Sequence, residues 1–297
     1  MKEKLFSIWK FIKDVVNSWG EDDIPRLGAA LSFYTIFSIT PILIIVIAVI
    51  GFFYNPNEAS GEVFLQIKEL AGKDAANLIQ NTFKNANASN AGLTATIISF
   101  ITLIIGATAL LEQLQNSLNT IYKVRRRKGR GILGIIKDRL IQFSLIIIFG
   151  FFIILFLVTG SVLSLLDNFI DERLSFILSA INFSFSFVIT SLLFAMLYKI
   201  LPDIHLAWKD VWIGSIVTTI LFILGKQLIT MYLGQTSYTS IYGAAGSLAV
   251  FLMWVFYSSQ VLFLGAEFTY VYAIQKGKGV RPDKDAVAVK FVKEQST

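Results

Sequence analysis

The sequence of 297 residues contains no cysteine and only one histidine, His205. The absence of cysteine excludes disulfides, thiolate metal ligands and cysteine nucleophiles. One imidazole cannot build a metal site from several histidines, and it permits only one histidine-based catalytic triad. We therefore expect no catalytic residues, no metal and no cofactor, and we interpret His205 as an ordinary loop residue rather than a catalytic base.

Charged residues are also scarce, at 15% of the chain against roughly 25% in soluble domains, while 55% of the residues are hydrophobic. A mean hydropathy of +0.67 excludes a disordered chain and disfavours a soluble globular protein. The chain is nevertheless basic, with a formal net charge of +6. This combination fits either a nucleic-acid-binding protein or a membrane protein whose charges lie in its loops.

Long stretches without charge locate the predicted membrane spans. The chain has 31 uncharged residues between Arg26 and Glu58 and 27 between Lys84 and Glu112, whereas about 20 apolar residues cross a bilayer as a helix. The first span begins too late and is too long for a cleaved signal peptide. Six spans are predicted, at residues 29–54, 92–113, 141–166, 174–198, 207–230 and 244–267.

The distribution of basic residues predicts the orientation of these spans. The segments on one side of the membrane contain 21 lysines and arginines, and those on the other side contain five. The positive-inside rule then places both termini in the cytoplasm. The predicted fold class is an all-α polytopic integral membrane protein, with a single membrane domain over residues 1–297. It is a six-transmembrane-helix bundle with an amphipathic cytoplasmic segment at 1–28 and a cytoplasmic tail at 268–297.

Residues 5–19 combine apolar side chains at helical spacing with lysines on the opposite side. This pattern predicts an amphipathic helix that lies on the inner leaflet of the membrane. A helix packed on the cytoplasmic ends of the bundle fits the pattern equally well.

The densest positive charge lies in the loop between the second and third predicted spans. This loop lacks the aromatic side chains that stack on bases, so topology and contact with anionic lipids explain its charge better than nucleic-acid binding. Free N–H groups at a following helix start would favour a lipid phosphate. The candidate headgroup ligands are Arg125, Arg126, Arg127 and Arg130.

Polar side chains within the spans are candidates for a substrate path, because polar groups in hydrocarbon usually face the bundle interior or a water-filled cavity. In the last span, Glu267 follows two small residues that permit close helix approach. The candidates are Tyr34, Ser38, Pro41, Glu112, Gln115, Asn116, Asn119, Lys226, Tyr257, Gln260 and Glu267.

Each group of candidates also has a simpler interpretation. The polar face from Glu112 to Asn119 would suit a solvated extension of the second helix. Lys226 would extend its ammonium group to the membrane interface. Glu267 would be an interfacial carboxylate paired with a loop arginine.

Three segments carry a distinctive residue pattern. They are residues 26–41 (RLGAALSFYTIFSITP), residues 201–214, and residues 242–268, which contain YGAAGS, LMWVFYSSQ and LGAEF. Together they resemble the YihY family of bacterial inner-membrane proteins, also called the virulence factor BrkB family and formerly labelled ribonuclease BN-like. The resemblance extends over nearly the whole chain.

The resemblance implies a six-helix protein of the bacterial inner membrane with both termini cytoplasmic, and it brings no established catalytic residues. Transport of a lipid or envelope precursor, as proposed for the family, suits a bundle lined by polar groups. We therefore expect a transporter or flippase-like handler of an anionic lipid or lipid-linked envelope precursor. Its expected partners are membrane lipids, not nucleic acid, and either a second copy of the chain or an envelope protein. A non-transporting scaffold or assembly factor is the alternative, and a ribonuclease is a remote one.

Overall fold

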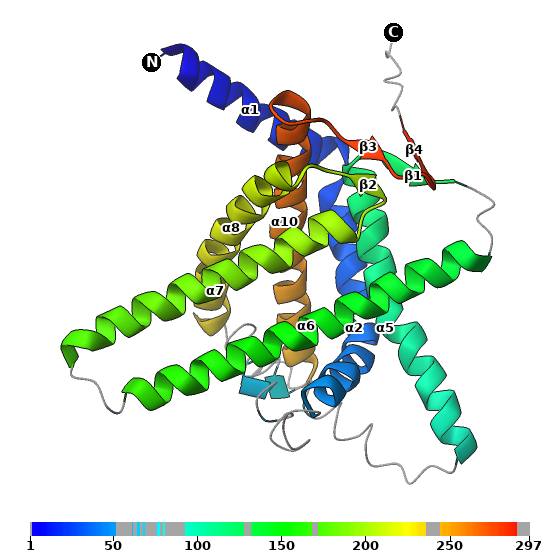
Figure 1. Ribbon diagram of the computed structural model, residues 1–297, viewed down its shortest axis with the longest axis vertical. Helices are drawn as coiled ribbons and strands as arrows, with labels where there is room; N and C mark the ends of the chain where they lie inside the picture. The colour runs from blue at the N-terminus through cyan, green and yellow to red at the C-terminus, as the bar shows by residue number, and fades with distance from the viewer. Residues whose placement is uncertain are drawn as a thin grey trace.

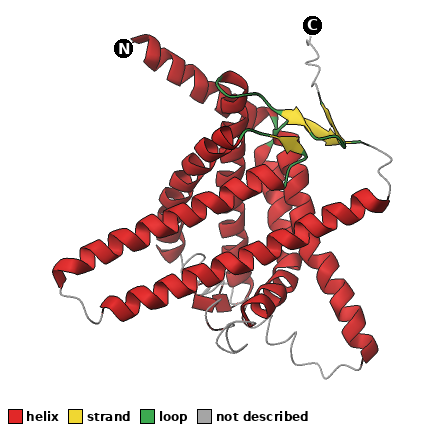
Figure 2. Ribbon diagram, viewed as in Figure 1, coloured by secondary structure: helices red, strands yellow, loops and turns green. Residues whose placement is uncertain are grey.

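Long helices make up most of the structure, a computed structural model that describes residues 2–51, 93–127, 132–167, 172–235 and 244–289, with isolated positions between 61 and 80. The amino-terminal helix α1 covers Lys2–Glu21. The longer helices are α2 (Ile24–Gly51), α5 (Leu93–Ile121), α6 (Ile132–Asp167), α7 (Glu172–Ile200), α8 (Trp208–Gln235) and α10 (Ala244–Gln275) (Figures 1 and 2).

The predicted spans coincide with these six longer helices, one span to a helix. Four segments of the described residues are long and apolar enough to cross a membrane, and they lie in α6, α7, α8 and α10. A shorter apolar segment, Ile24–Ile39, lies in α2. Residues 52–54 and 92, at the edges of two predicted spans, lie outside the described residues. The protein is thus a helical membrane protein, and length and hydropathy identify four spans among its described residues.

Helix α10 lies in the middle of the bundle and packs against both α8 and α2 (Figure 1). Its contact with α8 is close because each helix presents a glycine to a threonine of the other. A Cβ atom on Gly214 would collide with Thr269, and one on Gly265 would collide with Thr218. The two threonine hydroxyls donate to carbonyls of their own helices, Thr218 to Gly214 at 2.8 Å and Thr269 to Gly265 at 2.7 Å. Both threonine hydroxyls are therefore satisfied within their own helices despite the close approach.

Two pairs of short antiparallel strands lie at one end of the bundle, which we call the strand end (Figure 1). Strand β1 (Val124–Arg126) pairs with β4 (Ala286–Ala288), and β2 (Ile204–His205) pairs with β3 (Arg281–Pro282). The segment after α10 thus ties together the loops before α6 and before α8. The sequence had predicted a purely helical protein whose tail begins at residue 268, but α10 continues to Gln275 and the strands follow it.

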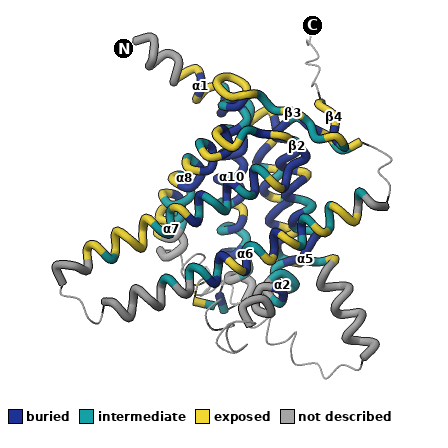
Figure 3. The backbone as a smooth tube through the Cα atoms, viewed as in Figure 1, coloured by how far each residue is buried: buried dark blue, intermediate teal, exposed yellow. Residues whose placement is uncertain are grey.

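Helices α6 and α7 cross the bundle at a steep angle and extend beyond it toward the loop that joins them (Figures 1 and 3). Apolar side chains on the projecting part of α7 are exposed, among them Phe176 at 78% and Phe183 at 60%. In a membrane, such a surface contacts lipid tails or another helix.

Helix α1 packs against the end of α10. Phe11 and Val15 are buried against Val271, and the Phe11 ring meets the edge of Phe268 at a centroid distance of 5.1 Å. The packed interpretation of the amphipathic helix is therefore confirmed for this side. The opposite side leaves apolar side chains exposed, so contact of that side with a membrane surface stays a prediction. These exposed side chains are Trp9, Ile12 and Val16.

The contact between α8 and α10 gives a stability prediction. We expect Gly214→Ala to lower the free energy of unfolding by about 1–3 kcal/mol, because the new methyl group overpacks the helix interface. The matched control is Gly20→Ala in α1, where a Cβ atom meets no atom within 4 Å. Alanine should stabilise that helix by up to about 1 kcal/mol. Unfolding temperatures in detergent measure both effects, and equal temperatures for the two variants would contradict the packing described here.

Candidate functional site

A buried polar network at the strand end is centred on Asp203, in the loop between α7 and α8. The side-chain amide of Asn119 donates to the Asp203 carboxylate at 2.7 Å, and Arg126 Nε donates to the same oxygen at 2.8 Å. In return, the backbone N–H of Asp203 donates to Asn119 Oδ1 at 2.8 Å. The loop is thereby fixed to α5 and β1.

The same network continues from Asp203 along α5 and α6. Gln115 Nε2 donates to Asp203 at 3.4 Å, and Gln142 Nε2 donates to Gln115 at 3.1 Å. Arg139 then donates to Gln142 at 3.2 Å and forms an ion pair with Glu112 at 2.8 Å. A chain of hydrogen bonds thus runs from the buried Asp203 to the half-exposed Glu112, and it joins α5 to α6.

This network accounts for most of the polar face predicted on the second span. Glu112, Gln115 and Asn119 belong to it, whereas Asn116 is exposed. Sequence reasoning missed three members, Asp203, Gln142 and Arg139. Gln142 had a detectable signal, as an amide within an apolar run. Asp203 had none, because only the folded loop brings it to α5.

The basic cluster divides in the structure. Arg126, predicted to bind a lipid headgroup, pairs instead with Asp203 and lies 3.5 Å from Asp138. Arg125 and Arg127 are exposed and keep their headgroup role as a prediction. Arg130 lies outside the described residues.

A second buried cluster forms where the corner between α1 and α2 meets α10 and the end of α5. Glu267 of α10 has no exposed surface, and its carboxyl group lies within hydrogen-bond reach of Asp22. Asp22 also forms an ion pair with Lys123. The backbone at Asp23 (φ 55°) and Lys123 (φ 57°) is in the left-handed region, so the chain turns sharply at both residues.

The predicted path residues of α2 point in different directions. Tyr34 is 40% exposed on the outer surface of the bundle, whereas Ser38 is buried. Pro41 does not end the helix, which continues to Gly51, and its ring packs against Gly106 of α5.

The remaining candidates lie at separate helix contacts. The Tyr257 ring packs against Gly225 of α8, and Gln260 Nε2 lies 3.5 Å from the Ile24 carbonyl of α2. Lys226 is partly buried in α8. These side chains therefore reinforce helix packing at different levels of the bundle and do not gather around one cavity of the described residues.

His205 pairs with Asp283 at 3.2 Å and joins β2 to the segment after β3. The backbone N–H of Lys284 donates to Asp283 at 2.7 Å and, together with His205, holds the pKa of that carboxyl below its usual range. His205 is 64% exposed. The sequence predicts a loop residue, whereas the structure places His205 in the short strand β2.

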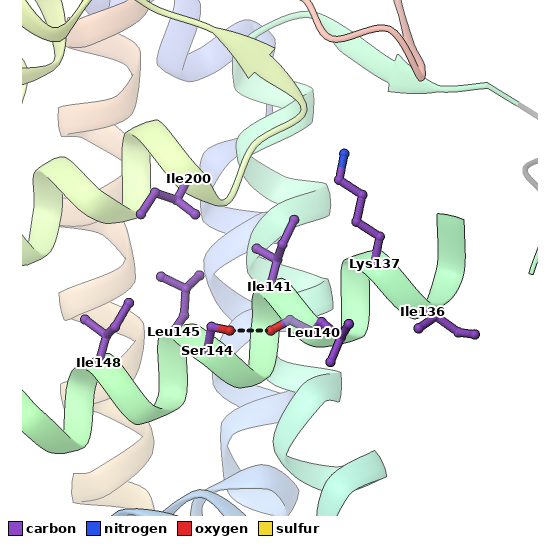
Figure 4. Close-up of a pocket in the computed structure, with 8 residues that line it drawn as sticks. All are labelled: Ile136, Lys137, Leu140, Ile141, Ser144, Leu145, Ile148 and Ile200. Carbon is purple, nitrogen blue, oxygen red and sulfur yellow. Dashed lines mark hydrogen bonds between the residues drawn. The ribbon is translucent and has the colours of Figure 1, made fainter. Parts of the chain in front are cut away.

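An apolar groove of about 370 Å³ lies along the outer face of α6 (Figure 4). Lys137 lines the groove near one end, and its ammonium group points away from α6 (Figure 4). The Ser144 hydroxyl donates to the Leu140 carbonyl at 2.7 Å. Sequence reasoning did not single out this surface, because its apolar residues look like any membrane span. The lining residues are Ile136, Lys137, Leu140, Ile141, Ser144, Leu145, Ile148 and Ile200.

Comparisons with known proteins agree on one family. The sequence profile of the family described as virulence factor BrkB matches residues 15–289. A UPF0761 membrane protein of Ralstonia nicotianae is 27% identical over 83% of this chain, and the match covers 55% of that protein. Another from Mannheimia succiniciproducens is 26% identical over 84% of this chain and 85% of its own length. A third, from Actinobacillus pleuropneumoniae, is 26% identical over 87% of this chain and 92% of its own length.

The chain therefore spans about half the length of the Ralstonia relative and most of the other two. No solved structure matches it.

The Asp203 network predicts a large effect of one substitution. Asp203→Ala should lower the free energy of unfolding by about 3 kcal/mol, because it leaves Asn119 and Arg126 without a shared acceptor in a buried site. Asn116→Ala is the matched control, since Asn116 is exposed on the same helix; its effect should stay within about 0.5 kcal/mol. Denaturation of the purified chain measures both, and an unchanged Asp203→Ala protein would show that the network is dispensable.

Proposed function

The chain belongs to the virulence factor BrkB family of membrane proteins, and on that premise we propose that it binds and moves an anionic lipid or a lipid-linked envelope precursor in the bacterial inner membrane. The observation that carries this proposal is the apolar groove along α6, with Lys137 at its end.

The proposed topology has six spans and both termini in the cytoplasm. An even number of spans is supported by the position of α1 and β4 at the same end of the bundle (Figure 1). The excess of lysine and arginine on the same side supports a cytoplasmic strand end. Lys137 then lies at the level of the inner-leaflet headgroups, which in bacteria include anionic phospholipids.

The groove and its charge have different roles in lipid binding. Its apolar wall accepts an acyl chain, but within a bilayer this alone gives little selectivity, because lipid tails are as apolar as the residues of the groove. Selectivity comes from Lys137, which attracts a phosphate, and from the exposed Arg125 and Arg127 in the segment that leads into α6. The groove therefore favours a lipid with a negative headgroup.

The projecting parts of α6 and α7 give such a lipid access from the side. The exposed apolar surface of α7 would lie within the hydrocarbon layer, so a lipid reaches the groove without leaving the bilayer. The sequence contains no Walker motif for nucleotide binding. Energy for directed movement would come from an ion gradient or a partner protein.

Lipid selectivity tests this proposal. The purified chain in mixed vesicles should retain phosphatidylglycerol in preference to phosphatidylcholine, as measured by native mass spectrometry. Lys137→Gln should reduce this preference roughly fivefold, since one basic side chain near an anionic surface contributes about 1 kcal/mol. Lys209→Gln is the matched control, because Lys209 is an exposed lysine on α8, away from the groove.

Transport is measured separately, as the movement of labelled phosphatidylglycerol across the membrane of proteoliposomes. Movement that is slowed by Lys137→Gln and not by Lys209→Gln supports the proposal. Equal retention of both lipids by the wild-type chain would overturn it. Selective binding without movement would favour the scaffold or assembly-factor alternative.

A further inference from the structure

The carboxyl groups of Glu267 and Asp22 share an unusual environment. Glu267 in α10 is fully buried, and Asp22 is 5% exposed. Neither carboxylate oxygen of Glu267, nor Oδ2 of Asp22, receives a hydrogen bond from an N–H or O–H group of the described residues. The Tyr122 hydroxyl is buried in the same cluster without a partner of standard hydrogen-bond geometry.

The charges in this cluster do not balance when both carboxyl groups are ionised. Lys123 supplies one positive charge and pairs with Asp22. Glu267 lies within hydrogen-bond reach of Asp22, so a second negative charge would sit against the first in a site closed to water. Two carboxylates cannot both stay ionised at such close range, and neither can donate a hydrogen bond to the other without a proton. One proton between them removes the second charge and forms an O–H···O bond.

Lys123 also attracts Glu267, and the other described groups around the pair add no further positive charge. From the corner between α1 and α2, the exposed Glu21 adds a further negative charge. The end of α5 contributes Tyr122 beside Lys123, and α10 contributes Tyr270, whose ring centroid lies 6.0 Å from Lys123 Nζ. The Tyr198 hydroxyl of α7 is not available to the carboxyl pair as a donor, since it already donates to the Leu262 carbonyl at 2.7 Å and contacts Thr218 at 3.0 Å.

We infer that Glu267 and Asp22 form a binding site for one exchangeable proton. The site lies near the strand end, and the Lys123 side chain, 18% exposed, leads from it to water. When the proton leaves to water, the O–H bond breaks and both carboxylates are negative, with Lys123 paired to one of them. The contact of α10 with the corner between α1 and α2 then weakens. This inference does not depend on the proposed lipid function.

Infrared spectroscopy of the full chain in nanodiscs tests for the proton directly. At neutral pH an ordinary glutamate is ionised, so a C=O stretching band of a protonated carboxyl should be seen in the wild-type protein and should disappear as the pH rises. Glu267→Gln should remove this band. Glu112→Gln is the matched control and should leave it unchanged, because Glu112 is 41% exposed and paired with Arg139.

The pH dependence of stability provides a second readout. The native wild-type protein retains a proton that the unfolded chain releases, so its unfolding temperature should fall as the pH rises above neutral. Glu267→Gln should show a smaller fall, since an amide cannot ionise. If Glu267→Gln does not fold, Asp22→Asn serves in its place and should shift the carboxyl band.

Three outcomes would overturn the inference. The first is a wild-type protein without a protonated-carboxyl band at neutral pH. The second is a band that persists unchanged in both the Glu267→Gln and the Asp22→Asn variants. The third is a band that responds to sodium ions at constant pH, which would identify the site as one for a metal cation.

Discussion

The close contact between α8 and α10 is the interaction on which the rest of the bundle depends. Gly214 and Gly265 let the two helices approach, and the facing threonines satisfy their hydroxyls within their own helices. Residues two positions apart on a helix point in nearly opposite directions. The contact that turns Gly265 toward α8 therefore turns Glu267 away from it, toward Asp22. The packing of Gly214 and Gly265 therefore sets how deeply the Glu267 carboxyl is buried and in which direction it points.

The strand end and the opposite half of α6 and α7 differ in how they are held. At the strand end, Asp203 joins three segments by hydrogen bonds, and two pairs of strands tie the segment after α10 to the loops. The far parts of α6 and α7 project beyond the bundle, and the described side chains on this part of α7 include exposed apolar ones. The groove on α6 lies between these two regions. Its Lys137 end is near the rigid strand end, and its apolar wall continues toward the projecting part.

The helices were predictable from the sequence because a helix that crosses a bilayer needs a long run of apolar residues, and such runs are visible as stretches without charge. The same rule placed the end of the last span at Glu267, because it assumes that a charged residue meets water. This end was wrong, since the Glu267 carboxyl is buried and α10 continues to Gln275. Asp22 and Asp203 gave no signal, since each lies in a short turn whose partners come from distant segments. Arg126 was counted with its basic neighbours, although folding directs it to Asp203.

Helix α5 physically connects the two sites that we propose. Near its middle, Glu112 and Gln115 bind Arg139 and Gln142 of α6, the helix that carries the groove. Just beyond its end, Lys123 pairs with Asp22 in the proton site. Release of the proton increases the negative charge that faces Lys123, so the force on the end of α5 changes. Coupling between sites requires an element that both of them bias. Helix α5 is the element placed between them, because it bonds to α6 through Glu112 and Gln115 and its end adjoins Lys123.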